Sequence, residues 1–445
     1  MTDQATGLTG GDPAYDRIRL AGMLDEAAEL EHSLCCQYLF AAFSMKRLAH
    51  EGLTPRQIDL VRDWETSLLM VARQEMEHLG LVTNILTAIG EAPHLVRPDF
   101  PLSPEYYELN VESKLQAFSR ESMRRFVLFE LPDNLEPNEL ARLDKLMPWL
   151  DWRRYRRRAH HTIGALYEEI DRLLAECDRA GNLFIGPESA QFITGGNNIQ
   201  GVRGVGTQGI SIYDIDLNGV SDLQSAQAAV KQIITEGEGD PEQRLDSHFG
   251  RFLTILEQLE AEIERDPTFA PARAVIEDPW TCVPGRGNGH KAGTPITNPL
   301  TNRVSQAFDL AYASLLLLLV RFFSATAESQ SDAQALESAA FFPMMTMVIR
   351  PLGEVLTELP ATEVPDGPCA GPSFTFERRV ALLPHRRAAF QVIHQSLETL
   401  HRALAGVCGD PGLAPRLAER LEFVFQNVWR IAHDFAAATN LGRSS

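Results

Sequence analysis

Charged side chains lie on the apolar face of two predicted helices, and this feature constrains the fold more than any other. In residues 68–89 apolar positions recur at helical spacing, and Glu75 and His78 fall on the same stripe. Glu31 falls in the same way on the apolar stripe of residues 24–45. A buried carboxylate is costly unless it is paired, protonated or bound to a metal ion. The chain must therefore bring these groups to a partner inside its core.

The spacing Glu75-x-x-His78 is typical of ferritin-like four-helix bundles, whose core holds iron or manganese. The carboxylate and the imidazole are one helical turn apart, so both can reach one ion or two neighbouring ions. Helical periodicity also dominates the rest of the chain and breaks where proline and glycine concentrate. It predicts helices over residues 17–51, 55–90, 110–131, 138–146, 149–180, 221–238, 241–265, 301–329, 333–359, 384–407 and 411–439. The expected fold is all-α: a ferritin-like four-helix bundle with a long loop insertion and a second helical domain.

Two irregular stretches interrupt the predicted helices. Residues 182–219 are rich in glycine and include a candidate short strand at 210–213. A loop of this length is usually functional or mobile. Two interpretations remain open: the loop covers a site, or it only extends over the surface. The second stretch is rich in proline, glycine and asparagine and is typical of a linker. The predicted division is a flexible arm at 1–16, a metal-binding bundle at 17–265, a linker at 266–300 and a helical domain at 301–440.

For the third and fourth bundle helices, the sequence leaves open which residues would bind the metal. In the third, Glu168 shares a face with small residues, whereas Glu169 borders a bulky apolar face. We favour Glu168, because a metal centre needs space beside its ligands. The fourth helix ends near Glu238, with Glu236 as the competing carboxylate, and it has no histidine at the expected spacing. Instead, His248 lies on the apolar face of the next predicted helix, which an interruption could return to the site.

Charge and cysteine content narrow the classes of function. The 41 Lys and Arg residues against 60 Asp and Glu residues give a net charge of −19, which argues against a nucleic-acid-binding groove. The 6 cysteines lack the paired spacing of zinc ribbons or disulfide scaffolds, so we expect a reducing compartment, the cytoplasm. Residues 1–16 are polar and unlike a signal peptide. The apolar run at 310–320 is shorter than the roughly 20 residues of a membrane span, and we expect a buried helix without membrane contact.

Several motifs together resemble a known family. They are Glu29-Leu-Glu31-His32 with Gln37-Tyr38-Leu39, Gln74-Glu75-Met-Glu-His78-Leu, Thr162-Ile-Gly-Ala-Leu-Tyr167, Gly237-Glu-Gly239 and Ser247-His248-Phe249. In this order they resemble the ferritin-like domain of the iminophenyl-pyruvate dimer synthase family, over roughly residues 17–260. The resemblance implies metal positions at Glu31, Glu75, His78, Glu168, Glu238 and His248. It also implies that Glu130 is a supporting carboxylate.

The resemblance implies a small organic substrate, since members of that family act on imines derived from amino acids. We predict a dinuclear non-haem metal centre, with iron as the expected metal and manganese as the alternative, that uses O2 or peroxide on a small organic substrate in specialised metabolism. Tyr38 is the candidate catalytic residue, by a hydrogen bond to the centre or by radical transfer; its alternative is a packed core tyrosine. The competing hypotheses are iron binding or peroxide removal without an organic substrate, and a metal-free scaffold.

The predicted second domain contains one further Glu-x-x-His pair, Glu398-x-x-His401. The helices around it offer no matching core carboxylates, so we interpret it as a surface or structural pair. The domain is expected either to cover the bundle or to build the interface of a homo-oligomer.

Overall fold

The computed structural model describes residues 13–107, 109, 111–150, 162–193, 217–239, 244–282, 292–325, 328–376 and 380–441. In this part of the chain the fold is built almost entirely from helices. The main helices are α1 (Pro13–Ser44), α2 (Pro55–Ala88), α3 (Arg120–Phe129), α4 (Pro137–Leu146), α6 (Ile163–Ala180), α7 (Leu223–Gly237), α8 (His248–Arg265), α9 (Pro299–Phe323), α10 (Gln330–Ala339), the π-helix η4 (Ala340–Ile349), α11 (Arg350–Leu356), α12 (Arg386–Ala405) and α13 (Pro415–Ala438). Single turns of 3-10 helix are η1 (Ala49–Glu51), η2 (Glu188–Ala190) and η3 (Arg244–Asp246).

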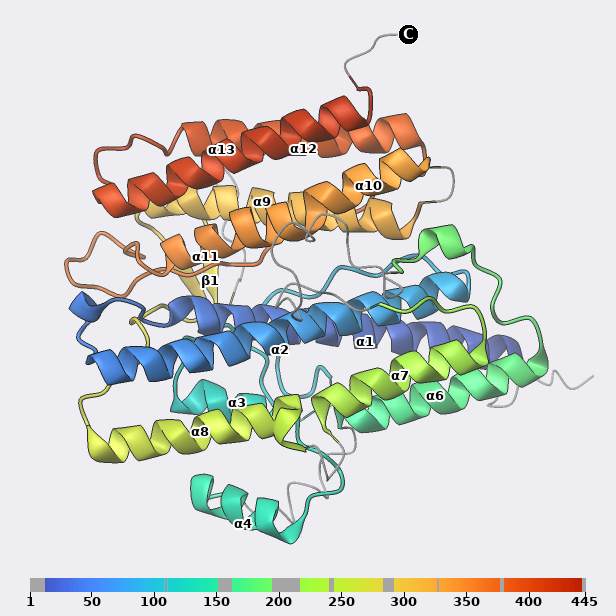
Figure 1. Cartoon of the computed structure of the whole chain (residues 1–445), viewed down its shortest axis with the longest axis horizontal. Coiled ribbons are helices and arrows are strands. Elements are labelled where there is room, and N and C mark those ends of the chain that lie inside the picture. Colours follow the sequence, from blue (N-terminus) through green and yellow to red (C-terminus); the bar gives the residue numbers. More distant parts are fainter. Residues whose placement is uncertain are drawn as a thin grey trace, which may run out of the picture.

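The helices form layers on both sides of α1 and α2 (Figure 1). Helices α1 and α2 pack side by side; α3, α6, α7 and α8 lie against one side of the pair, and α9 to α13 lie on the other side. A helix that is covered on both sides must be apolar around most of its circumference. Accordingly, nearly every side chain of α1 from Ala27 to Ser44 is buried.

Local sequence signals explain where the central helices begin. Helix α2 starts after Thr54, whose hydroxyl accepts a hydrogen bond from the Gln57 amide while the Gln57 side chain accepts one from the Thr54 amide. Pro55 occupies the first helical position, where its missing N–H has no partner to lose. This reciprocal cap fixes the register in which the α2 side chains enter the core.

The prediction of an all-α fold is confirmed in the described part of the chain. The helices predicted over 221–238 and 241–265 correspond to α7 and α8, and the break between them includes Gly239, with φ of +77°. The predicted linker contains two short parallel strands, β1 (Pro279–Thr281) and β2 (Thr294–Ile296), paired with Pro279 opposite Thr294. The candidate strand at 210–213 lies outside the described residues. One continuous hydrophobic core joins the predicted bundle to the C-terminal helices, and the predicted division into domains stays a prediction.

Two stretches, Pro299–Phe323 and Ser331–Leu356, are long and apolar enough to cross a membrane. In the structure 83% and 60% of their most apolar windows are buried inside the molecule. Burial of this extent is typical of the core helices of soluble proteins, so packing accounts for the apolar run at 310–320.

Asn84 of α2 anchors both flanks of the predicted loop insertion. Its buried amide donates to the main-chain oxygens of Phe192 and Asn218, at 2.8 and 3.1 Å, and accepts from the Phe192 amide at 2.9 Å. We predict that Asn84→Ala lowers the free energy of unfolding by about 1–3 kcal/mol, because buried main-chain groups lose their partners. Urea denaturation measures this loss. Asn218→Ala is the control: it removes an exposed side chain and keeps the main-chain oxygen, so an equal loss in both variants would contradict the anchoring role.

Candidate metal centre

Five charged or ionisable side chains converge between α1, α2, α3 and α8, on one face of the central helix pair. All are buried, with at most 3% of each residue exposed: Glu31, Glu75, His78, Glu130 and His248. Glu130 follows the last residue of α3, and His248 is the first residue of α8. We call these five residues the carboxylate–histidine cluster. Residues far apart in the sequence therefore meet in the core of the bundle.

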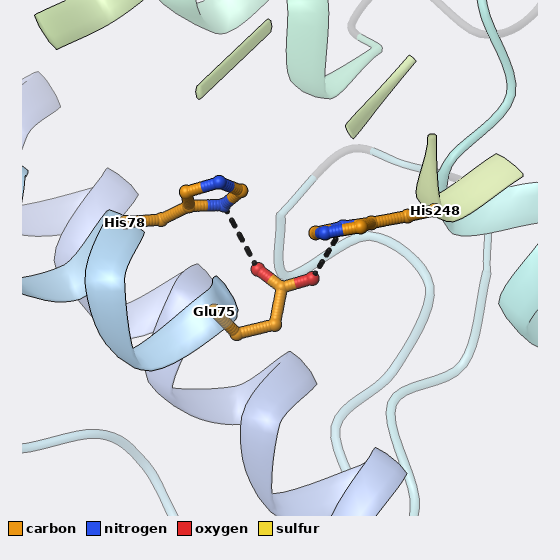
Figure 2. Close-up of side chains that lie close together, drawn as sticks. All are labelled: Glu75, His78 and His248. Carbon is orange, nitrogen blue, oxygen red and sulfur yellow. Dashed lines mark hydrogen bonds and ion pairs between the residues drawn. The ribbon is translucent and has the colours of Figure 1, made fainter. Parts of the chain in front are cut away.

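Glu75 lies at the centre of the cluster (Figure 2). Its Oε2 is 3.3 Å from Nδ1 of His78, and its Oε1 is 3.0 Å from Nδ1 of His248. The two imidazole rings stack, with centroids 5.3 Å apart and planes inclined by 27°. One carboxylate thus faces two imidazoles, one with each oxygen.

Two outer carboxylates complete the arrangement, one beside each imidazole. Oε2 of Glu31 is 3.5 Å from Nδ1 of His78, and Oε2 of Glu130 is 3.7 Å from Nδ1 of His248. The other oxygen of each outer carboxylate accepts a hydrogen bond of 2.5 Å from a buried tyrosine hydroxyl, that of Tyr167 for Glu31 and that of Tyr38 for Glu130. The cluster is therefore nearly symmetric about Glu75.

The pKa values of the cluster are shifted because its ionisable groups are buried and lie close together. Burial raises the pKa of Glu31 to about 7, and the charge of Glu75 adds to the rise. Burial lowers the pKa of His248, but nearby Glu75 and Glu130 outweigh it and raise that pKa to about 9. For His78, burial is again outweighed, here by hydrogen bonds to Glu236, Glu31 and Glu75, and the pKa rises well above its usual value. Without another cation, the cluster retains protons.

The donor atoms fit a bound metal. Neither ring nitrogen of His248, nor Oε1 of Glu75, makes a well-aligned hydrogen bond with any described residue, although all three atoms are buried. One ligand atom from each of Glu75, His78 and His248 lies within 4.8 Å of the others. Buried polar atoms without hydrogen bonds are unfavourable unless an ion occupies the space between them.

The preference for Glu168 on the third bundle helix is wrong. Glu168 is exposed, and Glu169 forms ion pairs with Arg19 and Arg172 at the surface. The neighbouring residue Tyr167 is the one that points inward, and its hydroxyl donates a hydrogen bond to Glu31. The small-residue face that favoured Glu168 does provide space, but Glu238 fills that space.

Glu238 lies beside the cluster rather than in it, and Glu236 contacts an imidazole instead. A Cβ at Gly164 would lie 2.1 Å from Oε1 of Glu238, so only glycine leaves room for this carboxylate at the start of α6. Burial raises the pKa of Glu238 to about 7, and the charge of Asp133 adds to this, against hydrogen bonds from the Asp133 and Gly164 amides. Oε2 of Glu236 lies 3.0 Å from Nε2 of His78. Periodicity could not separate the two glutamates, because the helix ends between them.

Glu398 is exposed, and the ring of His401 stacks on Phe425 at 4.3 Å between centroids. Among the described residues, the group close enough to share one metal ion is the one on α2 and α8, and it does not include this pair. The structure thus agrees with a surface or structural pair.

Comparisons with known proteins place the chain. The sequence model of the ferritin-like family matches residues 24–257. Dichlorochromopyrrolate synthase of Lentzea aerocolonigenes is 29% identical over 425 residues, which cover 88% of this chain and 39% of that protein. The 2-imino-3-(indol-3-yl)propanoate dimerase of Chromobacterium violaceum is 31% identical over 146 residues, which cover 29% of this chain and 15% of that protein. The chain thus spans well under half the length of these curated relatives.

A solved ferritin-like protein from Caulobacter vibrioides is also similar, with a TM-score of 0.40 and 18% identity, covering 72% of this chain and 94% of that one. Both curated relatives belong to the iminophenyl-pyruvate dimer synthase family that the motifs resemble. Because the family match spans more than half of the sequence, this chain belongs to the ferritin-like family.

Proposed function

We propose that this protein is a dinuclear non-haem metal oxidoreductase that acts on a small organic substrate. The observation that carries the proposal is Glu75, whose two oxygens face different imidazoles at 3.3 and 3.0 Å. A carboxylate between two imidazoles has the donors to bridge two ions, as in the dinuclear carboxylate centres of ferritin-like bundles. First-row transition metals accept this mixture of carboxylate and imidazole donors.

The near-symmetry of the cluster suggests how it would hold two ions. One position would take donors from Glu31, Glu75 and Nδ1 of His78. The other would take donors from Glu75, Glu130 and Nδ1 of His248. Each position would then be held by two carboxylates and one imidazole, and the bound metal would supply chemistry with O2 or peroxide. Iron is the expected metal, and manganese the alternative, because both accept this donor set.

Glu236 supports the first position through His78. A metal-binding imidazole usually donates its other N–H to a carboxylate, which fixes the tautomer and the ring orientation. Oε2 of Glu236 lies 3.0 Å from Nε2 of His78 and is suited to that role. The Nε2 proton would then stay on the side of Glu236, and Nδ1 would present its lone pair to the cluster.

The residues of the chain hold protons and orient ligands, and the bound metal would supply the redox chemistry with O2 or peroxide. The hydroxyls of Tyr38 and Tyr167 donate to Glu130 and Glu31, so each leaves one carboxylate oxygen to face the cluster. Tyr38 also packs edge-on against Phe126 and Phe252, which fixes its ring. We therefore assign Tyr38 a positioning role through Glu130, instead of direct contact with the reacting atoms.

The names of the relatives indicate the class of substrate. One relative is a dimerase of an indole-bearing imino acid, and the other is a synthase of dichlorochromopyrrolate. We infer that the substrate of this chain is a small aromatic molecule derived from an amino acid, in specialised metabolism. The match covers a minor part of each relative, so the reaction belongs to this proposal.

We predict that protein loaded anaerobically with Fe(II) binds about two irons per chain and that Glu75→Ala loses most of both, because the bridging carboxylate is removed. Elemental analysis of desalted protein measures the metal content. Glu168→Ala is the matched control, since it removes an exposed carboxylate that lies outside the cluster. Absence of metal from the wild-type protein, or equal metal content in both variants, would contradict the dinuclear centre. Fe(II) oxidation unaffected by any aromatic imino acid would favour iron handling without an organic substrate.

The two glutamates at the end of α7 should differ in their effects. Glu236→Ala should weaken iron binding by about 10- to 100-fold, because the partner of His78 Nε2 is lost. Glu238→Ala should leave the metal affinity nearly unchanged and lower the melting temperature, since its carboxylate accepts from the main-chain amides of Asp133 and of Gly164 at the start of α6. Competition with a chelator measures the affinity. A larger loss in Glu238→Ala would reverse the assignment.

The metal-free protein should lose stability as the pH rises from about 6 to 9. His248 has a pKa raised to about 9 in the folded state, so its contribution is complete below the unfolded value of 6.5 and disappears as the pH passes 9. Glu31, with its pKa raised to about 7, contributes in the same direction: its stabilisation is complete below 4.5 and is lost as the pH passes 7. Urea denaturation across this pH range tests the prediction. His248→Gln should reduce the loss of unfolding free energy between pH 6.5 and 9. Bound metal should reduce this loss too, because the ion replaces the protons that the cluster holds. A flat profile for the metal-free wild-type protein would refute it.

A further inference from the structure

A cavity of about 460 Å³ lies on the other side of the central helix pair from the carboxylate–histidine cluster. Its walls come from α1 and α2 on one side and from α9 and the π-helix η4 on the other. The C-terminal helices pack against α1 and α2 on this side (Figure 1). The cavity therefore lies where the C-terminal helices meet the bundle. Its volume is in the range of pockets that bind small organic molecules.

The walls are apolar and adaptable. Helix α9 contributes Leu315, Leu316 and Leu319, and α2 contributes Met70 and Met76. Leucine side chains present a smooth apolar surface, and methionine side chains adjust to the shape of a ligand. A flat hydrophobic molecule suits these walls.

The π-helix explains why the layers leave a space here. The segment Ala340–Ile349 is wound as a π-helix and contains Pro343. Such wide turns disturb regular packing and are frequent at functional sites. Met345, Thr346 and Ile349 of this segment line the cavity.

One end of the cavity carries a buried polar group. Tyr312 of α9 hydrogen-bonds Nε2 of His32 through its hydroxyl, and Sγ of Cys36 lies 3.3 Å from the same hydroxyl. His32 and Tyr312 are at most 5% exposed, and both line the cavity, as does Cys36. A few fixed polar groups inside an apolar pocket are what orients a ligand.

A cationic side chain lies at the open end. Arg62 of α2 lines the cavity, its side chain is 62% exposed, and it contacts an exposed carboxylate, that of Asp59, at 3.8 Å. An exposed pair at this distance is weak, so the guanidinium can turn to a ligand. Arg350 also lines the cavity, but it pairs with Glu354 at 2.8 Å.

We propose that this cavity binds an acidic aromatic small molecule, with its ring between the leucines of α9 and the methionines of α2 and its carboxylate at Arg62. A hydrogen-bonding atom on the ring would reach Tyr312. Cys35, which lines the cavity, lies one helical turn from Glu31, so α1 connects the cavity to the carboxylate–histidine cluster on its other face. That the ligand is the organic substrate rests on the proposed function; that the cavity binds such a molecule does not depend on a metal.

The test uses 3-(indol-3-yl)propanoate, which has the carbon skeleton named in one relative and lacks the reactive imine. Titration calorimetry on the full chain should give saturable binding at one site per chain. Arg62→Ala should weaken it by about tenfold, the effect of losing one charged hydrogen bond. Arg265→Ala is the matched control, since Arg265 is also 62% exposed and lies outside the cavity, and it should bind as the wild-type protein does.

Two variants fill the cavity. Leu316→Trp, or Thr346→Trp on the half-buried wall if the first variant does not fold, should abolish binding of the probe. No saturable binding to the wild-type protein, or unchanged binding to a folded filled variant, would overturn the proposal.

Metal content and probe binding, both measured on the wild-type protein, separate this inference from the proposed function. If the wild-type protein holds metal but does not bind the probe, the cavity proposal fails and the metal centre stands. If the probe binds and the protein takes up no metal, the metal centre fails and the cavity stands.

Discussion

The interaction on which the rest of the structure depends is the burial of Glu75 between His78 and His248. A carboxylate and two imidazoles leave water only when charges, protons or an ion compensate for their desolvation. The surrounding fold provides that compensation with Glu31 and Glu130, with two tyrosine hydroxyls and with Glu236. These groups come from α1, the end of α3, α6 and α7, so the bundle must assemble fully before the cluster is satisfied. We infer that the cluster selects one packing of α1, α2, α3, α6, α7 and α8.

The break between α7 and α8 is part of the same solution. In a continuous helix Glu236 and His248 would lie about 18 Å apart along the axis and about 120° apart around it, so both could not reach the same cluster. The break ends α7 just after Glu236 and starts α8 at His248, with Ser247 accepting a hydrogen bond from the Gly250 amide. The irregular backbone therefore brings both Glu236 and His248 to the cluster from a single bundle position.

The central helix pair carries a different chemistry on each face. Glu31 of α1 faces the carboxylate–histidine cluster, and the next residue, His32, lines the apolar cavity under the C-terminal helices. Similarly, Glu75 faces the cluster and Met76 lines the cavity. Neighbouring residues on a helix point about 100° apart, so one pair of helices can serve both sites. The C-terminal helices accordingly do more than cover the bundle, since they form the second wall of the cavity.

The sequence predicted the part of the site that depends on one helix at a time. Glu31, Glu75 and His78 were identifiable because a charged residue on an apolar stripe is an exception that helical periodicity reveals. The same reasoning was wrong for Glu168, because a stripe of small residues indicates space and does not say what fills it. In the structure Glu238 fills it, beside Gly164, and the neighbouring Tyr167 reaches Glu31.

By itself, then, the sequence determined the helical class, the start of α2 and the inward faces of the two longest bundle helices, since these follow from local periodicity and capping. Only the tertiary structure decided how the residues of the shorter elements join them. The sequence indicates His248 by the apolar face of its predicted helix and Glu130 by the family resemblance, but both lie at helix ends, and the contact of Glu236 with His78 depends on where α7 stops. The cavity, too, is decided by the tertiary structure, because helices that are distant in sequence form its walls. One of them is a π-helix, which no local sequence pattern predicts.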